Sequence, residues 1–338
     1  MRIKQEVLEQ LKKNPLKLKE AMDKHGIPGG DIAVLVEGEV DYYMARGERD
    51  GDGRPLAAGT LFESASLTKS LFATLVMRLA EEGVLQLNKP IVEQYDHEPW
   101  SKNPAYDAIT PRHVLCHGSG LPGWEERPMD MLFTPGEGYS YSGEGYYLLQ
   151  HMVEALTGTA MNELFRERFY RPWGMQWTEA DWTPEVGQAM SYGFDCEGKV
   201  SKIRNCHDDE GVAPEPNAAW SLYSCSADYA RFLSKMIKEK GGLTEASFEE
   251  MTSHQNQATY GVSWGLGFGL VDEATSVLWH WGDNSGFKNF SIWDKETGDG
   301  VVIHTNCDRG MDFYMELLKE LTDGQFYDQI RNFIEEAE

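Results

Sequence analysis

The sequence is short of basic residues and has no long apolar run. Its 338 residues include 31 Lys and Arg against 55 Asp and Glu, which gives a formal net charge of -24. Binding to a phosphate backbone depends on Lys and Arg, so nucleic acid is excluded as the expected partner. Apolar runs such as IAVLV, residues 32–36, are far too short to cross a bilayer. We therefore expect a soluble chain with no membrane partner.

Cysteine is scarce as well. The sequence has no CxxC pair, and its five cysteines are an odd set: Cys116, Cys196, Cys206, Cys225 and Cys307. Such a set argues against a disulfide framework and against a zinc knuckle, so the thiols are expected to be structural. The basic N-terminal segment, residues 1–26, spaces its apolar residues as one amphipathic helix and lacks the continuous apolar core of a signal peptide. The sequence therefore predicts a cytoplasmic protein.

Strand-like segments occur towards both ends of the chain, and helical patterns fill the middle. Residues 31–51 are predicted to form two strands that turn at Glu37 and Gly38, and further strand-like runs lie between residues 264 and 306. Helices are predicted at both termini. This order predicts a discontinuous α/β sheet domain, residues 1–82 and 217–338, interrupted by a mainly helical domain, residues 83–216. We expect the active site at the interface of the two domains.

Two local patterns give more detailed expectations. The run WGLGFGLV, residues 264–271, is predicted to be a strand, and KETGDG, residues 295–300, a hairpin turn. The segment that follows Cys225 has the apolar spacing of an amphipathic helix, which we expect to be capped by Ser226 and closed by Gly241.

The stretch FESASLTKSLFATL, residues 62–75, begins a helical pattern with a serine and carries a lysine three residues later. Positions i and i+3 share a helical face, so Ser66 and Lys69 could meet as a nucleophile and its proton acceptor. Serine is also a common helix-starting residue. An SxxK pattern arises often by chance, so this motif alone does not decide between the two interpretations.

Three more motifs follow in a fixed order: HGSGLP at residues 117–122, YSGEGY at 141–146 and HWG at 280–282. Together with SLTK they resemble the serine hydrolases related to class C β-lactamases, whose relatives include penicillin-binding proteins, D-amino-acid peptidases and esterases. The family patterns are SxxK, HTSGLP, YSN followed by Gly-Tyr, and HxG. The resemblance covers about residues 29–306. It implies an α/β (α+β) β-lactamase/transpeptidase-like fold, an antiparallel sheet flanked by helices with an all-helical second domain.

The resemblance also assigns roles in an acyl-enzyme cycle. Ser66 would attack, near the unpaired N–H groups and positive end of its helix. Lys69 would accept the serine proton, for which burial and neighbouring positive charge must lower its pKa. Tyr141 would relay the proton to the leaving group and later activate water. The backbone N–H groups of Ser66 and Asp283 would form an oxyanion hole.

Two departures from the family pattern bear on the substrate. Gly143 replaces the usual asparagine, so a side-chain amide that often touches the substrate is missing. His280, Gly282 and Asp283 lie where penicillin-recognising members have Lys-Thr-Gly and a following Ser or Thr. A histidine is at most partly charged at neutral pH, and the aspartate would repel a carboxylate. Gly143, His280, Gly282 and Asp283 are the residues predicted to bind the substrate. Because this set suits a β-lactam carboxylate poorly, we expect weak or no β-lactamase activity.

The predicted function is therefore a serine hydrolase acting on a small-molecule ester or amide. A D-amino-acid peptidase or amidase, and an acyl transferase, would use the same site. The alternative from another functional class is a catalytically inactive, penicillin-binding-like binding or sensor protein. The missing asparagine is the observation that suggests it. Retention of both Ser66 and Lys69 speaks against it, because a buried lysine beside a serine has no other chemical use.

Several motifs favour simpler interpretations. His113 and His117 lie four apart, as helical metal ligands do, but Val114 replaces the glutamate of HExxH. GLGFG, residues 265–269, lacks the GxGxxG spacing of a dinucleotide loop. We expect no metal and no cofactor. Three nearby tyrosines compete with Tyr141 for its role, namely Tyr139, Tyr146 and Tyr147. The tryptophan candidates for the pocket wall are Trp124, Trp173, Trp177 and Trp182.

Overall fold

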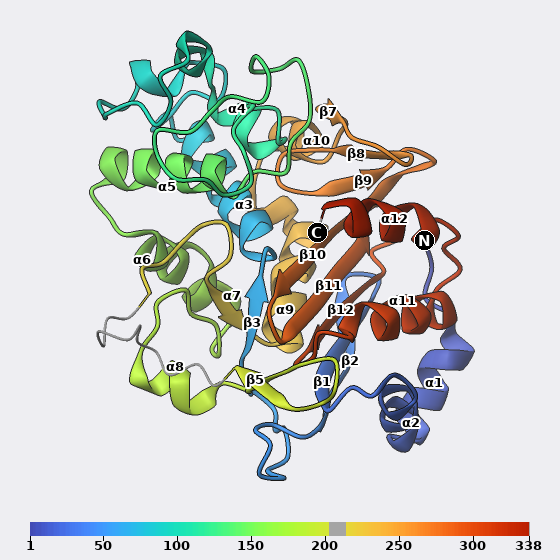
Figure 1. Cartoon of the computed structure of the whole chain (residues 1–338). Helices are drawn as coiled ribbons and strands as arrows, with labels where there is room; N and C mark the ends of the chain where they lie inside the picture. Colours follow the sequence, from blue (N-terminus) through green and yellow to red (C-terminus); the bar gives the residue numbers. More distant parts are fainter. Residues whose placement is uncertain (203–213, 338) are drawn as a thin grey trace.

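An eight-stranded antiparallel sheet forms the centre of the computed structural model, which describes residues 1–202 and 214–337 (Figure 1). The strand order is β2-β1-β12-β11-β10-β9-β8-β7, so strands from both ends of the chain pair with each other. The strands of the sheet are β1 (Gly29–Val36), β2 (Glu39–Gly47), β7 (Asn256–Gln257), β8 (Val262–Trp264), β9 (Gly269–Val271), β10 (Ala274–Asn284), β11 (Phe287–Asp294) and β12 (Gly300–Thr305).

Helices cover both faces of this sheet. Helix α9 packs against β1, β2 and β12, and α11 packs against β11 and β12 on the other face, beside α12 (Figure 1). Because both faces are covered, every residue of β12 is buried, which explains its continuous apolar pattern. These helices are α9 (Ser226–Glu239), α11 (Gly310–Leu321) and α12 (Tyr327–Ala337).

The remaining helices lie at the N-terminus, beside the sheet and in the middle of the chain. They are α1 (Gln5–Lys13), α2 (Leu16–His25), α3 (Thr68–Glu81), α4 (Pro111–Leu115), α5 (Gly143–Thr157), α6 (Met161–Phe165), α7 (Arg171–Trp173), α8 (Pro184–Ala189) and α10 (Glu245–Met251), with 3-10 helices η1 (Ile91–Glu93), η2 (Pro104–Ala108) and η4 (Lys240–Gly242) and the π-helical η3 (Arg166–Tyr170). The single helix predicted over residues 1–26 is two helices. The break falls at Asn14 and Pro15, because proline cannot donate a helical N–H.

The middle of the chain differs in one respect from the all-helical expectation. It contains a hairpin of β4 (Gly193–Phe194) and β5 (Val200–Lys202). The hairpin returns to the sheet: the Phe194 N–H donates to the Asn306 carbonyl at 2.9 Å, and the Asp308 N–H donates to the Phe194 carbonyl at 3.1 Å. The division at residues 83 and 216 stays a prediction.

Two local expectations are wrong. Residues 264–271 form two strands, β8 and β9, because Gly267 turns the chain with a φ of +91°. Ser226 is the first residue of α9 and does not cap it. Its hydroxyl instead donates to Asp31 Oδ1 at 2.6 Å, within a buried network that includes His304.

Strand β3 (Phe62–Ala65) carries the chain to Ser66. It pairs with β6 (Leu222–Ser224) and lies against β10 and β11. This approach explains Gly282, since a Cβ at that position would overlap the Ser64 carbonyl oxygen. The glycine of the HWG motif is therefore required for β3 to pass across the sheet edge.

The cysteines that the structure describes are all free thiols. Cys116, Cys225 and Cys307 are buried free thiols, Cys196 is an exposed one, and Cys206 lies outside the described residues. Within residues 1–202 and 214–337, no helix combines the length and apolarity needed to cross a membrane.

Candidate active site

Ser66 lies in the turn between β3 and α3, two residues before the helix begins, and not at the helix start itself. The preceding Ala65 has a φ of +49°, a left-handed conformation that costs a non-glycine residue roughly 1–2 kcal/mol. Thr68 supports this conformation: its hydroxyl donates to the Ala65 carbonyl at 2.6 Å and accepts the Leu222 N–H at 3.0 Å. The strained turn holds the Ser66 side chain at the mouth of a cavity.

Lys69 lies in the first turn of α3 and is 1% exposed. Its Nζ lies 3.0 Å from Ser66 Oγ and donates to the Ala219 carbonyl at 2.8 Å. Burial lowers the pKa of Lys69 to about 7. Burial alone accounts for the shift, whereas the sequence had suggested a neighbouring positive charge as well. With only neutral oxygen atoms as hydrogen-bond partners, the amine is largely neutral above pH 7 and can accept the Ser66 proton.

Tyr141 lies on the loop before α5, with its ring centre 4.7 Å from Lys69 Nζ. Its hydroxyl is buried and has no hydrogen-bond partner of normal geometry among the described residues. Burial raises the pKa of Tyr141 well above its usual value, although an interaction with Ser66 lowers it slightly. The phenol is therefore protonated at neutral pH, so it is suited to donate a proton.

Among the four neighbouring tyrosines, Tyr141 alone lines the cavity that contains Ser66. The Tyr146 hydroxyl donates to the Leu115 carbonyl at 3.1 Å, and the Tyr147 hydroxyl donates to Glu215 at 3.3 Å. Tyr139 faces an adjoining hollow. The Gly-Tyr pair that follows Tyr141 therefore identifies the residue that the structure brings to Ser66 and Lys69.

His117 holds the Tyr141 loop in place, a function that sequence reasoning missed. Its ring centre lies 4.3 Å from that of Tyr141, and its Nδ1 accepts the Ser142 N–H at 3.1 Å. Burial, with Lys69 and His280 nearby, lowers the pKa of His117 well below its usual value, so the ring is neutral and can accept. The HGSGLP motif marked this residue without indicating its use.

The metal interpretation of the two histidines finds no support in their contacts. His113 Nδ1 accepts the Thr110 N–H at 3.3 Å as part of a helix cap, while His117 Nδ1 is occupied by the Tyr141 loop. In the described part of the chain, no three His, Cys, Asp or Glu side chains are grouped as metal ligands would be.

The edge of β10 forms one wall of the Ser66 cavity, whose volume is about 660 Å³. Strand β9 pairs with β10 only as far as Trp279, so beyond this residue the edge of β10 is open. Trp281, Asp283 and Asn284 line the cavity. Of the side chains predicted for the β10 part of the substrate wall, that of Asp283 lines this cavity.

His280 and Gly282 do not line the cavity, which corrects the prediction. The His280 ring is fully buried and stacks on Trp281 with ring centres 5.4 Å apart. Its Nδ1 binds the Trp281 carbonyl at 2.7 Å. Burial, with Lys69 nearby, lowers the pKa of His280 to about 3, so the ring carries no charge at neutral pH. His280 is therefore buried beside Trp281 and is not among the residues that line the cavity.

Asp283 does not present an unopposed negative charge. Lys288, its cross-strand neighbour on β11, forms an ion pair with it, and both residues line the cavity. Asp283 was expected to repel a substrate carboxylate. The close positive charge of Lys288 offsets the field of Asp283, so the ion pair presents a neutral surface instead. Sequence reasoning missed Lys288.

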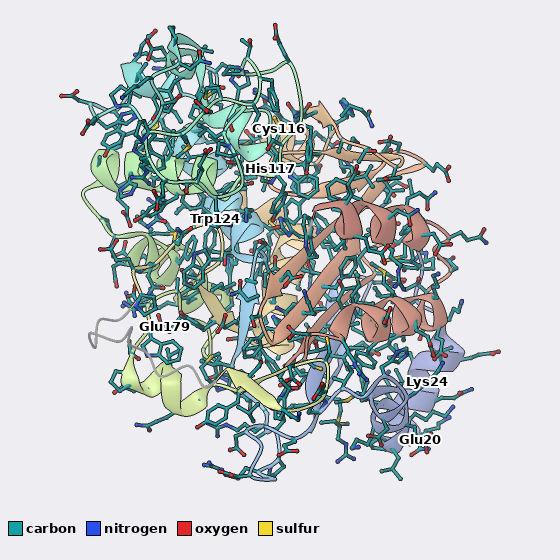
Figure 2. The ribbon with its side chains drawn as sticks, in the orientation of Figure 1. Glu20, Lys24, Cys116, His117, Trp124 and Glu179 are labelled. Carbon is teal, nitrogen blue, oxygen red and sulfur yellow. The ribbon has the colours of Figure 1, made fainter. Side chains whose placement is uncertain are left out.

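One of the four predicted wall tryptophans lines the cavity. Trp124 lies beside the N-terminal end of α3, with Ser66 and Lys69 in the same cavity (Figure 2). Trp173 packs on Phe169 and Trp182 on Tyr223, while Trp177 lines a separate surface hollow. Besides Lys288, the wall residues that were not foreseen are Gly123, Ala219, Trp220, Asn284 and Ala337.

Comparison with known proteins decides the family. A protein-family model described as Beta-lactamase matches residues 17–322. The chain belongs to the beta-lactamase family. Penicillin-binding protein 4* of Bacillus subtilis (strain 168) is 24% identical over 353 residues, which span 90% of this chain and 74% of that protein.

Solved structures agree with this beta-lactamase family fold. A class C β-lactamase mutant aligns with a TM-score of 0.74 at 17% identity, over 90% of this chain and 98% of that one. D-alanine carboxypeptidase AmpC from Burkholderia cenocepacia aligns with a TM-score of 0.73 at 16% identity, over 91% and 100%. The predicted β-lactamase/transpeptidase-like fold is confirmed, and the protein is a β-lactamase-like member of a serine hydrolase family.

For this beta-lactamase family member we expect ester cleavage to rise with pH and level off above about 7, the pKa that burial gives Lys69. Below that value the ammonium form dominates, so kcat/KM should fall about tenfold per pH unit. The depressed pKa values of His117 and His280 keep both rings neutral across this range. A pH profile of kcat/KM for p-nitrophenyl acetate measures the break. A flat profile through neutrality would contradict Lys69 as the base.

Proposed function

We propose that the protein hydrolyses a carboxylic ester or amide through an acyl-enzyme on Ser66. The arrangement of Ser66 and Lys69 carries this proposal. Lys69 Nζ lies 3.0 Å from Ser66 Oγ, is fully buried, and has a pKa of about 7. A lysine in this setting is a proton acceptor at neutral pH, because desolvation disfavours its charged form.

In the first half of the proposed cycle, neutral Lys69 takes the Ser66 proton as Oγ bonds to the substrate carbonyl carbon. The carbonyl oxygen becomes an oxyanion, which the backbone N–H groups of Ser66 and Asp283 would stabilise. The bond from carbon to the leaving oxygen or nitrogen then breaks. Tyr141 donates its proton to the departing alcohol or amine and regains one from Lys69, so the protons balance.

In the second half, water replaces the leaving group. Tyr141 and Lys69 accept a proton from the water as it attacks the acyl carbon, and the same path returns a proton to Ser66 Oγ when the acid departs. An acyl transferase would follow the same steps with an alcohol or amine in place of water. An amidase or D-amino-acid peptidase would differ only in the leaving group.

The charge of the cavity favours an uncharged substrate over a β-lactam. Among the described residues that line it, those that can carry a charge near neutral pH are Lys69, which is largely neutral above pH 7, and the ion pair of Asp283 and Lys288. A β-lactam carboxylate would therefore meet no unopposed cation, and His280 supplies none. Amides stay candidate substrates, because the similar structures include a β-lactamase and a D-alanine carboxypeptidase.

An inactive sensor is the less favoured alternative, since it has no use for a desolvated lysine beside the serine. The small-molecule substrate and the cytoplasmic location stay predictions.

We expect p-nitrophenyl butyrate to be cleaved with a kcat/KM at least about a hundredfold above that for benzylpenicillin. Asp283→Asn is the diagnostic variant, because it removes the one carboxylate among the described residues that line the cavity, while the backbone N–H remains. Penicillin acylation should then rise roughly tenfold, about the effect of one close charge, and ester cleavage should change little. Intact-mass detection of the penicilloyl adduct follows the first reaction. Penicillin turnover equal to ester turnover in the wild type would overturn the substrate proposal.

A further inference from the structure

A second hollow of about 570 Å³ adjoins the Ser66 cavity at Tyr141 and is lined by residues such as Ser140, Thr259 and Phe333. Gly123, Tyr141 and Ala337 line both spaces, whereas Ser66 and Lys69 line only the first. The site therefore has two arms that meet at Tyr141. In the proposed cycle the leaving group must reach the Tyr141 proton, so it takes the arm beyond Tyr141. The acyl group must then lie in the other arm.

Three tryptophans line the arm that remains for the acyl group, namely Trp281 of the β10 wall, Trp220 and Trp124. Trp220 follows directly after Ala219, whose carbonyl accepts from Lys69 Nζ, so it lies on the lysine side of Ser66. Trp124 comes from the loop before α5 and has 58% of its surface exposed. A large exposed indole within a catalytic cavity is a ready surface for an apolar or aromatic group.

Gly143 and Trp124 fit together. A Cβ at position 143 would overlap the Trp124 indole, with Cε2 only 2.6 Å away. The backbone supports this contact, because the Gly143 and Glu144 N–H groups both donate to the Gly123 carbonyl, at 3.0 and 3.1 Å. Gly143 therefore leaves room for the indole at this position, and the backbone does not itself demand a glycine, since its φ is not in the left-handed region. The indole occupies the room that any side chain at position 143 would need.

We infer that Trp124, lying over Gly143, determines acyl-group specificity and selects a bulky apolar or aromatic acyl group. This inference rests on the proposed function for the direction of the two arms. An indole face offers apolar area and ring stacking but no hydrogen bond to an acyl-side amide. A small acyl group such as acetyl would leave the indole uncovered.

The test compares p-nitrophenyl phenylacetate with p-nitrophenyl acetate, because the leaving group is the same in both. The quantity measured is the ratio of the two kcat/KM values. Trp124→Ala should lower this ratio at least about tenfold relative to the wild type, and Trp124→Phe should retain most of it. Gly143→Asn should lower it as Trp124→Ala does, because the new side chain displaces the indole. Leu132→Ala is the matched control, since Leu132 is equally exposed, at 59%, and lies outside the cavity.

A binding measurement separates this inference from the proposed function. Calorimetry on Ser66→Ala, with and without Trp124→Ala, compares N-methylphenylacetamide with N-methylacetamide. If the wild type cleaves no ester but the aromatic amide binds at least tenfold more weakly without Trp124, the proposed function fails and the inference holds. If esters are cleaved and neither the ratio nor the binding changes in Trp124→Ala, the inference is overturned.

Discussion

Ser66→Ala should reduce ester hydrolysis by about 10⁴-fold or more, the scale seen when a catalytic nucleophile is removed. The variant keeps the left-handed turn at Ala65 and the hydrogen bond from Lys69 to the Ala219 carbonyl. The chemistry is therefore lost while the fold is retained. Steady-state rates with p-nitrophenyl butyrate, beside a thermal melt, measure both effects.

Ser70→Ala is the matched control for this variant. Ser70 lies on the same helix, and its buried hydroxyl donates to the Gly267 carbonyl at 2.8 Å. Its loss should lower the melting temperature by a few degrees and leave kcat/KM within about threefold. If Ser66→Ala kept more than a tenth of the wild-type rate, the nucleophile would have to be another residue.

Lys69→Met should reduce kcat/KM by roughly 10²–10⁴-fold, the usual contribution of a general base. Its thermal stability should stay within a few degrees of the wild type. The methionine removes the desolvation penalty of a buried amine, which offsets the lost hydrogen bond to the Ala219 carbonyl. Activity and stability therefore separate in this variant.

Two measurements on Lys69→Met check the prediction: kcat/KM at pH 8 and a thermal melt. A variant that is as active as the wild type would assign the base to another group. A variant that unfolds at ambient temperature would show that Lys69 is structural, which contradicts the pKa argument.

The sequence predicted which candidate residues meet, because its signals are local. Ser66 and Lys69 are three residues apart, and the turn closed by the Lys69 N–H on the Ser66 carbonyl, at 3.0 Å, brings them together. Tyr141 was fixed by the Gly-Tyr pair that follows it, and the structure places its ring 4.7 Å from Lys69 Nζ. The strand pattern likewise predicted strands towards both ends of the chain, since β1 and β10–β12 carry runs of buried residues.

The pocket wall was predicted less well because it depends on long-range packing. His280 is buried and stacks on Trp281, a contact that no spacing rule gives. Trp124 and Gly143 are distant in sequence and meet only in the folded loop. Ala337 reaches the cavity from the far end of α12.

The partner of Asp283 could have been found from the sequence. Asn284 pairs with Phe287 across a two-residue turn, so Asp283 must face Lys288 on the next strand. Counting the register of this hairpin would have shown that the charge of Asp283 is opposed. Two-residue turns therefore carry information about charge as well as about topology.

The most direct test of the account is to find which residue a fluorophosphonate modifies. The wild type is labelled with the probe, digested, and analysed by tandem mass spectrometry, with Ser66→Ala and Ser70→Ala treated alongside. We expect one phosphonyl group on the Ser66 peptide in the wild type and in Ser70→Ala, and none in Ser66→Ala. A label on any other residue, or no label in the wild type, would contradict an acyl-enzyme on Ser66.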